Sequence, residues 1–208
     1  MSSYIYTPWG YEVASLPALL SVSDFHTITC NRHTDKSVAQ IDSAIDAASA
    51  AIRNVCGWHV APSLECRATI TAGDELTGER TRIVALPASY VSGIYSVTED
   101  GEELPSGQFA AMKNGLLRRT CFKSWSNRWG GVEVDYQAGF DLTTVPDLSN
   151  AAAHVIEAAL SIPIGVSSET AGSVSVSYDT QVSAVAAMTA AQLSGALSAY
   201  KVVRSHAA

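Results

Sequence analysis

One amphipathic segment, residues 35–57, constrains the fold more than any other part of the chain. Its apolar side chains recur at spacings of three and four, which places them on one face of an α-helix. These side chains are Val38, Ile41, Ile45, Ala48, Ile52 and Val55. Asp35 can accept N–H bonds of the first turn, and Gly57 can adopt the left-handed conformation that ends a helix. An isolated helix of this length is marginally stable in water, so other segments must cover its apolar face.

Composition and charge narrow the class of protein. The chain has 208 residues, 47% of them apolar and 16% charged, which is typical of a globular protein with one core or one core plus a small inserted domain. Its net charge is −7 and no segment is clearly basic, which argues against tight binding to nucleic acid or to an anionic membrane. The sequence shows no secretory signal pattern and no apolar stretch long enough to span a membrane, so we expect no membrane partner.

The cysteines indicate a reduced environment. They are widely and unevenly spaced, and no two of them form the C-x-x-C pair of a zinc ribbon or a thioredoxin-like site. The four are Cys30, Cys56, Cys66 and Cys121. We therefore expect free thiols rather than disulfides.

The N-terminal part, residues 1–22, is predicted to be an irregular arm. It carries several aromatic residues, which pack either on the chain's own core or on a neighbouring subunit. These are Tyr4, Tyr6, Trp9 and Tyr11, of which Trp9 and Tyr11 are candidates for contact with a neighbouring subunit. A short helix at residues 23–29 follows, with Ser23 or Asp24 as its cap.

A run of short strands occupies residues 65–137. Polar and apolar positions alternate there, and turn residues such as the pair Asp100-Gly101 separate the alternating stretches. The predicted strands cover residues 65–71, 82–86, 90–98, 109–112, 116–120 and 132–136. Together they predict a compact antiparallel β domain inserted between helices.

Helical periodicity returns at Pro146 and continues to Ile162, in a segment so apolar that most of its faces must be buried. A polar loop at residues 167–170 and a strand at residues 174–178 are expected next. Thr189 is predicted to cap a last helix, in which Leu193, Leu197 and Tyr200 share one face, followed by a tail that contains Arg204. These last four residues complete the predicted contact set.

The predicted fold class is therefore α+β, a small helical bundle built on a long central helix with an inserted antiparallel β unit. In this division residues 1–22 form the arm, residues 23–64 and 138–203 the helical core, and residues 65–137 the inserted domain. Residues 180–208 form a C-terminal segment suited to contact with another subunit.

No known catalytic motif is present in the sequence. It lacks the patterns of serine hydrolases, P-loop nucleotide-binding proteins, dinucleotide-binding proteins and zinc proteases, so we assign no catalytic, cofactor-binding or metal-binding residue. His154 and Glu157 could begin a carboxylate-bridged metal site, but such sites need carboxylates from other helices. We favour a histidine satisfied by its neighbours.

A basic and aromatic cluster precedes the last predicted strand of the β domain. Its members are Arg118, Arg119, Lys123, Trp125, Arg128 and Trp129. The cluster could stack on nucleic-acid bases. Because the loops nearby are acidic, we favour a hairpin whose tryptophans cover the β core.

In the order and spacing of four stretches, the sequence resembles the head–tail connector (adaptor, or head-completion) proteins of tailed phages. The stretches are IDSAIDAASAAIRNVCGWHVAP at 41–62, LPASYVSGIYSVTEDGEEL at 86–104, GVEVDYQAGFDLTTVPDLSNAAAHVIEAAL at 131–160 and SETAGSVSVSY at 168–178. With the closing LSGALSAYKV they cover nearly the whole chain. None of them is a catalytic motif, and the long β insertion is typical of the larger family members.

This resemblance implies a structural role without catalytic residues or a cofactor. It implies a homo-oligomeric ring, typically a dodecamer, that lies beneath the portal of the virion neck, extends the DNA channel and docks a stopper or tail-completion protein. DNA would pass without specific binding, and an acidic wall suits that passage. Candidates to face the channel or a neighbouring subunit are Asp74, Glu75, Glu79, Glu99, Asp100, Glu102 and Glu103. The resemblance also implies that residues 180–208 and the N-terminal arm reach the portal or a neighbour, with the candidates Trp9, Tyr11, Leu193, Leu197, Tyr200 and Arg204.

Two alternatives to the adaptor role stay open. Another ring of the neck, such as the stopper or tail-completion protein, fits the same composition. A cryptic hydrolase is an alternative of a different class, and it would need a pocket that brings a nucleophile and a base together.

Overall fold

A computed structural model describes residues 4–74, 76–161, 168–171, 174–177 and 195–202. The chain divides into two compact units. Residues 1–17, 56–144 and 200–208 form the first, here called the sheet unit, and residues 18–55 and 145–199 form the second, the helix unit. The expected boundaries of arm, core and insertion stay a prediction.

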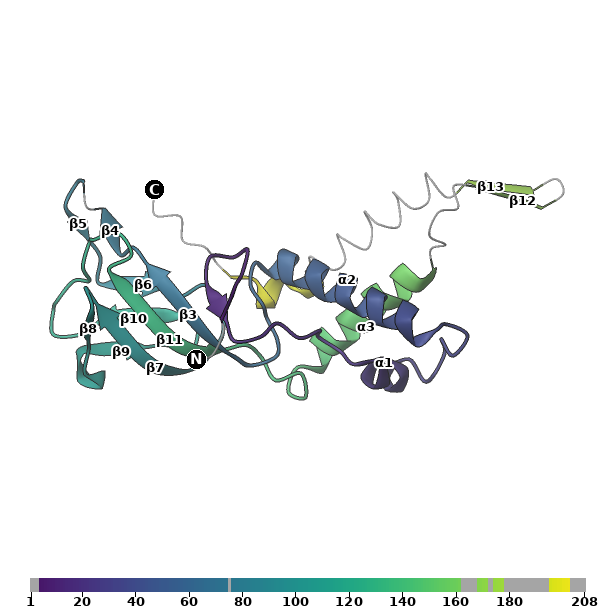
Figure 1. Cartoon of the computed structure of the whole chain (residues 1–208), viewed down its shortest axis with the longest axis horizontal. Coiled ribbons are helices and arrows are strands. Elements are labelled where there is room, and N and C mark those ends of the chain that lie inside the picture. Colours follow the sequence, from purple (N-terminus) through teal and green to yellow (C-terminus); the bar gives the residue numbers. More distant parts are fainter. Residues whose placement is uncertain (1–3, 75, 162–167, 172–173, 178–194, 203–208) are drawn as a thin grey trace. The chain divides into compact units, whose positions relative to one another are not determined.

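The sheet unit is built on a six-stranded antiparallel sheet in the order β1-β2-β3-β11-β7-β8. The long strands β3, β11 and β7 run through its middle (Figure 1). The strands are β1 (Ile5–Tyr6), β2 (Glu12–Val13), β3 (Leu64–Ile70), β7 (Val91–Glu99), β8 (Glu102–Glu103) and β11 (Val132–Ala138).

A second sheet of the same unit has three antiparallel strands in the order β6-β10-β9. They are β6 (Ile83–Ala85), β9 (Phe109–Ala111) and β10 (Leu116–Arg119), and the turn η1 (Ser106–Gln108) precedes β9. A small hairpin, β4 (Gly73–Asp74) with β5 (Glu79–Arg80), lies before β6. The strands predicted between residues 65 and 137 are confirmed, with ends that differ by one or two residues.

Buried and more exposed side chains alternate along the central strand β11. In β11 the residues Val132, Val134, Tyr136 and Ala138 are buried, whereas Glu133 between them is exposed. Successive side chains of a strand point to opposite faces, so this pattern gives β11 one core face and one polar face.

Three α-helices lie in the helix unit: α1 (Val22–Ile28), α2 (Val38–Cys56) and α3 (Pro146–Ser161). All three were expected at these places. The caps differ, because Ser21 exchanges hydrogen bonds with Asp24 in a capping box, and Ser37, not Asp35, caps α2 by accepting from the Gln40 amide at 3.3 Å. Gly57 has φ +77, the left-handed conformation expected after the helix.

The C-terminal part of the described chain has β12 (Ser168–Ala171) paired with β13 (Val174–Ser177), and the short helix η2 (Ser198–Tyr200). The strand at residues 174–178 was expected, but the polar loop at residues 167–170 was not correct, because β12 occupies most of it. Most of the predicted last helix lies outside the described residues.

The predicted fold class is wrong in its architecture. The described chain has three helices and two larger antiparallel sheets and is mostly β; it is not a helical bundle built on a long central helix. Two observations give the reason. The sheet unit has its own core, with Trp58, Trp125 and Tyr136 fully buried, and the apolar face of α2 is shorter than predicted, since Val38 is 67% exposed.

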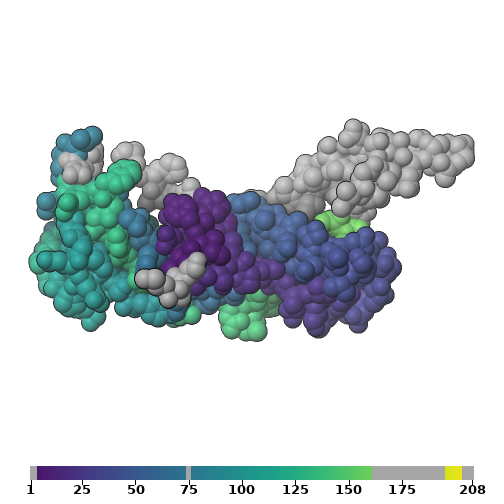
Figure 2. Space-filling view, viewed as in Figure 1, coloured from purple at the N-terminus to yellow at the C-terminus, as the bar shows by residue number. Residues whose placement is uncertain are grey.

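The predicted irregular arm also needs correction, because it extends the sheet. β2 pairs with β3, with Val13 opposite Cys66, and β1 pairs with β2. In the space-filling view the first described residues, in dark purple, lie beside the teal part of the sheet unit to which they belong (Figure 2). Two-residue strands carry little periodic signal, so the alternating aromatic residues did not reveal them.

The four cysteines are free thiols, as expected. Cys56 and Cys66 are buried, and burial raises the pKa of their thiols to about 11 and about 12, respectively, so neither is a reactive thiolate near neutral pH. None of the helices in the described ranges is both long and apolar enough to cross a bilayer.

An ion pair on the polar face of the central strands predicts a pH effect on stability. The Arg67 guanidinium, whose Nε lies 2.6 Å from Asp135 Oδ1, holds the pKa of that carboxyl below its ordinary value. A carboxyl with a lowered folded-state pKa contributes stability above its unfolded value of about 3.9, and the contribution is lost as the pH falls through the folded value.

We therefore expect Asp135→Asn to lower the free energy of unfolding at pH 7 by up to about 1 kcal/mol, since the pair is partly exposed, and to have less effect at pH 3. Denaturant unfolding at both pH values measures this. Glu133→Gln, on the same strand, is the control. A loss of equal size at pH 7 and pH 3 would contradict the assignment.

Candidate interaction surfaces

The acidic turn between β7 and β8 contains four of the predicted contact residues. Asp100 has φ +53 and Gly101 has φ +87, so both central residues are left-handed, as a two-residue hairpin turn of type I′ requires. Asp100, Glu102 and Glu103 are exposed. Glu99 differs, because its side chain is only 15% exposed and points into the unit.

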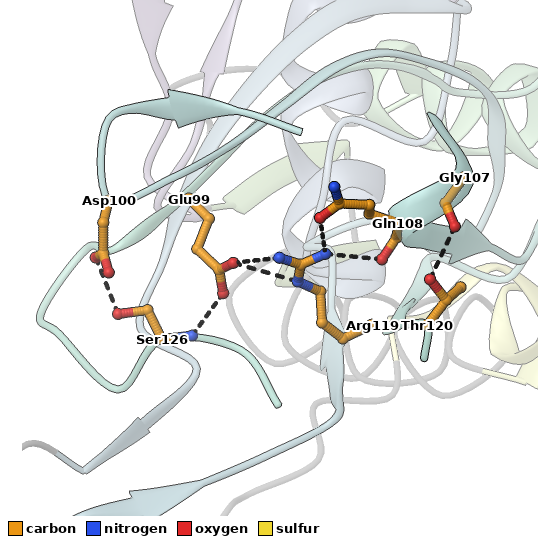
Figure 3. A network of polar contacts seen from close by, with 7 residues as sticks. All are labelled: Glu99, Asp100, Gly107, Gln108, Arg119, Thr120 and Ser126. Atoms are coloured by element: carbon orange, nitrogen blue, oxygen red, sulfur yellow. Dashed lines mark hydrogen bonds and ion pairs between the residues drawn. The ribbon is translucent and has the colours of Figure 1, made fainter. Parts of the chain in front are cut away.

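Glu99 is the centre of a buried polar network (Figure 3). Its Oε2 accepts from Arg119 Nη2 at 2.7 Å and from Arg119 Nε at 3.2 Å, and its Oε1 accepts from the Ser126 amide at 2.7 Å. Arg119 Nη1 also donates to the backbone oxygen of Gln108 at 2.9 Å and to its Oε1 at 3.0 Å. Glu99 therefore joins β7 to β10 and to the loop that follows β10, and its role is to hold the structure together.

The members of the basic and aromatic cluster differ in burial, and the network around Glu99 holds two of them inside. Arg119 is 6% exposed and its guanidinium lies 5.4 Å from the ring centroid of Trp125, which is fully buried. Trp125 thus covers the β core, as we favoured. Trp129 does not, because it is 87% exposed. The sequence gives the two tryptophans the same kind of neighbours, so it could not distinguish them.

The second acidic segment is the β4–β5 hairpin. Asp74 pairs through the backbone with Glu79, and Glu79 is exposed. Glu75 lies outside the described residues. A channel-facing or intersubunit position for these residues, and for the turn at residues 99–103, stays a prediction.

The terminal contact candidates lie partly inside the chain's own packing. Tyr11 is 1% exposed, and Trp9 is half-buried with its ring centroid 6.3 Å from that of Tyr11. Tyr200 is 7% exposed, and its backbone oxygen accepts from Trp58 Nε1 at 2.6 Å. Leu197 is fully buried. Leu193 and Arg204 lie outside the described residues, and a contact of the whole set with a portal or neighbour stays a prediction.

Sequence reasoning did not identify the buried residue His59 as a connector of the sheet unit. Its Nε2 lies 2.9 Å from the backbone oxygen of Ala138, which can only accept, so Nε2 carries the proton. Nδ1 therefore accepts from the Tyr11 hydroxyl at 2.8 Å, and that hydroxyl accepts from the His59 amide at 2.9 Å. No sequence signal pairs residues this far apart.

We expect Tyr11→Phe to lower the free energy of unfolding by about 2 kcal/mol, because two buried groups of His59 lose this partner. Tyr95→Phe is the matched control, since the Tyr95 hydroxyl donates to Gln137 Oε1 from a side chain that is 57% exposed. Denaturant unfolding of both variants measures the difference. Equal losses would show that the Tyr11 hydroxyl is not specially placed.

Glu157, considered above as the start of a metal site, forms an ion pair with Arg32 and lies close to two histidines in the helix unit. Its Oε1 lies 3.1 Å from Arg32 Nη2 and 3.3 Å from His33 Nε2, and its Oε2 lies 3.6 Å from His154 Nδ1. Within the described ranges, no group of three or more His, Cys, Asp or Glu side chains is arranged so that it could hold a metal ion. The cluster connects α3 to the segment before α2.

A family model described as "Head completion protein" matches residues 18–191, which is more than half of the chain. No curated protein sequence matches significantly.

Chains of gene transfer agent (GTA) particles are among the solved structures with a similar fold. A chain in the virion of a native gene transfer agent (GTA) particle has 16% identity and a TM-score of 0.57, covering 93% of this chain and 95% of that one. A chain in the neck of an empty GTA particle, solved with C6 symmetry, has 17% identity and a TM-score of 0.54 over 76% and 86% of the two chains. A chain in the neck of the native particle, solved with C12 symmetry, has 15% identity and a TM-score of 0.50 over 93% and 98%.

Proposed function

Because the chain belongs to the head completion protein family, we propose that it acts as a head-to-tail adaptor, a ring beneath the portal that extends the DNA channel and docks the stopper or tail. Whatever its exact position in the neck, the chain is a structural head-completion protein of the virion neck. The observation that carries this is the family match over residues 18–191.

The ring is supported by the structures that share the fold. Two of them are chains of particle necks, with C6 and C12 symmetry, and a twelvefold axis fits twelve copies of a subunit. We propose a dodecamer of this chain on the same grounds. The portal protein on one side and a stopper or tail-completion protein on the other are its proposed partners.

The negative net charge of the chain supports a channel through which DNA passes without being bound. With a net charge of −7 the chain repels phosphate, so genomic DNA would pass along the ring without specific binding. We propose that the β4–β5 hairpin and the turn at residues 99–103 face the channel or the next subunit. The chain is proposed to have no enzymatic activity, as befits a structural family.

An averaged cryo-EM map of the neck of purified virions tests this proposal. The expected result is a ring directly below the portal into which the sheet unit and the helix unit fit, with the C-terminal segment touching the portal. A fit only further down, at the stopper or tail end, would replace the adaptor role by that of another neck ring. Absence from the virion would contradict a structural role and favour the hydrolase alternative.

A further inference from the structure

The side chain of Trp129 is exposed at the surface, unlike the two tryptophans in the core of the sheet unit. It is 87% exposed, whereas Trp58 and Trp125 are fully buried. Exposing so large an apolar ring forgoes the stabilisation that burial would give, and tryptophan is enriched at protein interfaces. Trp129 borders an open groove of about 260 Å³, whose walls also carry the carboxylates of Asp100 and Glu133.

The walls of this groove, here called the Trp129 groove, are held in place by hydrogen bonds. Asp100 Oδ1 accepts from Ser126 Oγ at 2.9 Å, and the Asp100 amide donates to the backbone oxygen of Gly131 at 2.8 Å. The Gly130 amide donates to Thr71 Oγ1 at 3.0 Å. A wall that is already ordered loses little conformational freedom when a ligand binds.

Two glycines beside Trp129 keep the wall close to the acidic turn. A Cβ on Gly131 would lie 2.8 Å from Asp100 Oδ1, and Gly130 has φ +64, a conformation that favours glycine. Any larger residue at position 131 would displace the Asp100 carboxylate. The loop therefore holds its backbone at Gly131 against the Asp100 side chain, and both Asp100 and Trp129 line the groove.

The charges of the groove select the kind of ligand. Two acidic residues, Asp100 and Glu133, and one basic residue, Arg128, line the groove, so the formal charge of its lining residues is negative. A phosphate of nucleic acid would be repelled by the carboxylates. A guanidinium would stack on the indole face and donate to the carboxylates, which an ammonium does less well because it lacks a planar face.

We infer that the Trp129 groove receives an arginine side chain of a neighbouring protein in the particle. The identity of the donor as a particle protein rests on the proposed function, but the preference for a guanidinium rests only on the groove. This gives part of the acidic turn a specific partner chemistry, in which Asp100 binds a cation and Glu99 behind it supports the loop.

The test uses the full chain and two small probes, Nα-acetyl-arginine amide and its uncharged isostere Nα-acetyl-citrulline amide. Saturation-transfer NMR observed on the probe works for a monomer and for a large ring. We expect the arginine probe to bind and the citrulline probe not to bind. The double variant Asp100→Asn/Glu133→Gln should weaken arginine binding by about fivefold or more, since each exposed ion pair adds a modest amount.

Two features make these variants informative. Asparagine tolerates the left-handed conformation of position 100 and keeps an oxygen that can accept from Ser126, so the turn is retained. Phe122→Ala is the matched control, because Phe122 is 88% exposed and is not part of the groove. Trp129→Ala should abolish binding of the arginine probe, and Phe122→Ala should leave it unchanged.

Three results would overturn the inference: equal binding of citrulline and arginine, full arginine binding by the double variant, or binding of oligothymidylate or a disaccharide in the groove in place of arginine. The test of the groove and the test of the proposed neck role can fail independently. Arginine binding by a chain absent from the neck would refute the proposed function alone, and a neck ring without arginine binding would refute the groove alone.

Discussion

Replacing Glu99 with alanine is expected to lower the free energy of unfolding by about 3 kcal/mol, the largest effect of any acidic residue in the β7–β8 turn. Arg119 is 6% exposed and its guanidinium would keep its charge in a buried position without the carboxylate that neutralises it. The Ser126 amide would lose its acceptor as well. Denaturant unfolding of the full chain measures the loss.

The turn itself provides the controls for this prediction. Glu102→Ala and Glu103→Ala remove exposed carboxylates of the paired strand β8 and should change the free energy of unfolding by no more than about 0.5 kcal/mol. If all three substitutions had the same small effect, the network in Figure 3 would not be a stabilising one. The comparison also separates the structural carboxylate of Glu99 from those proposed to contact partners.

The second large effect is expected in α2, where Ile41→Ala should cost about 3 kcal/mol. Ile41 is fully buried, so truncation removes apolar contacts and leaves a cavity. Unfolding of the helix unit followed by circular dichroism in denaturant measures the loss.

Val38→Ala tests the same apolar face one turn earlier. Val38 is 67% exposed, and alanine is the better helix former, so the change should stay within about 0.5 kcal/mol. The sequence pattern alone predicts similar losses at both positions. Equal losses would therefore support the longer apolar face that the sequence suggested and contradict the burial seen in the structure.

Local patterns were sufficient for most elements. The two- and 3.6-residue periods located the strands β3, β6, β7, β9, β10 and β11 and the helices α2 and α3, because a side chain's face depends only on its position along its own element. The two-residue strands β4, β5 and β8 were not predicted. Turn chemistry placed Asp100-Gly101, since few residues adopt two successive left-handed conformations. The order and spacing of four stretches of sequence were enough to indicate the family.

The architecture was not predictable in this way. The weight given to α2 suggested a helical bundle, but the described chain is mostly β, with a sheet unit that has its own core. Which elements pack together depends on contacts between distant residues, such as Val13 opposite Cys66, and a two-residue strand leaves no period to read. The resemblance could not replace that information, because family membership does not report how each unit is built.

The candidate contact residues show the same division. The sequence by itself determined the acidic composition of the turns, the free thiols, the element positions and the family. Only the tertiary structure decided that Glu99 is half-buried and paired with Arg119 while Asp100 lines a groove, and that Trp125 is buried in the core while Trp129 is exposed. The physical reason is that burial and charge pairing arise between residues far apart in the sequence, and these meet only when the strands assemble.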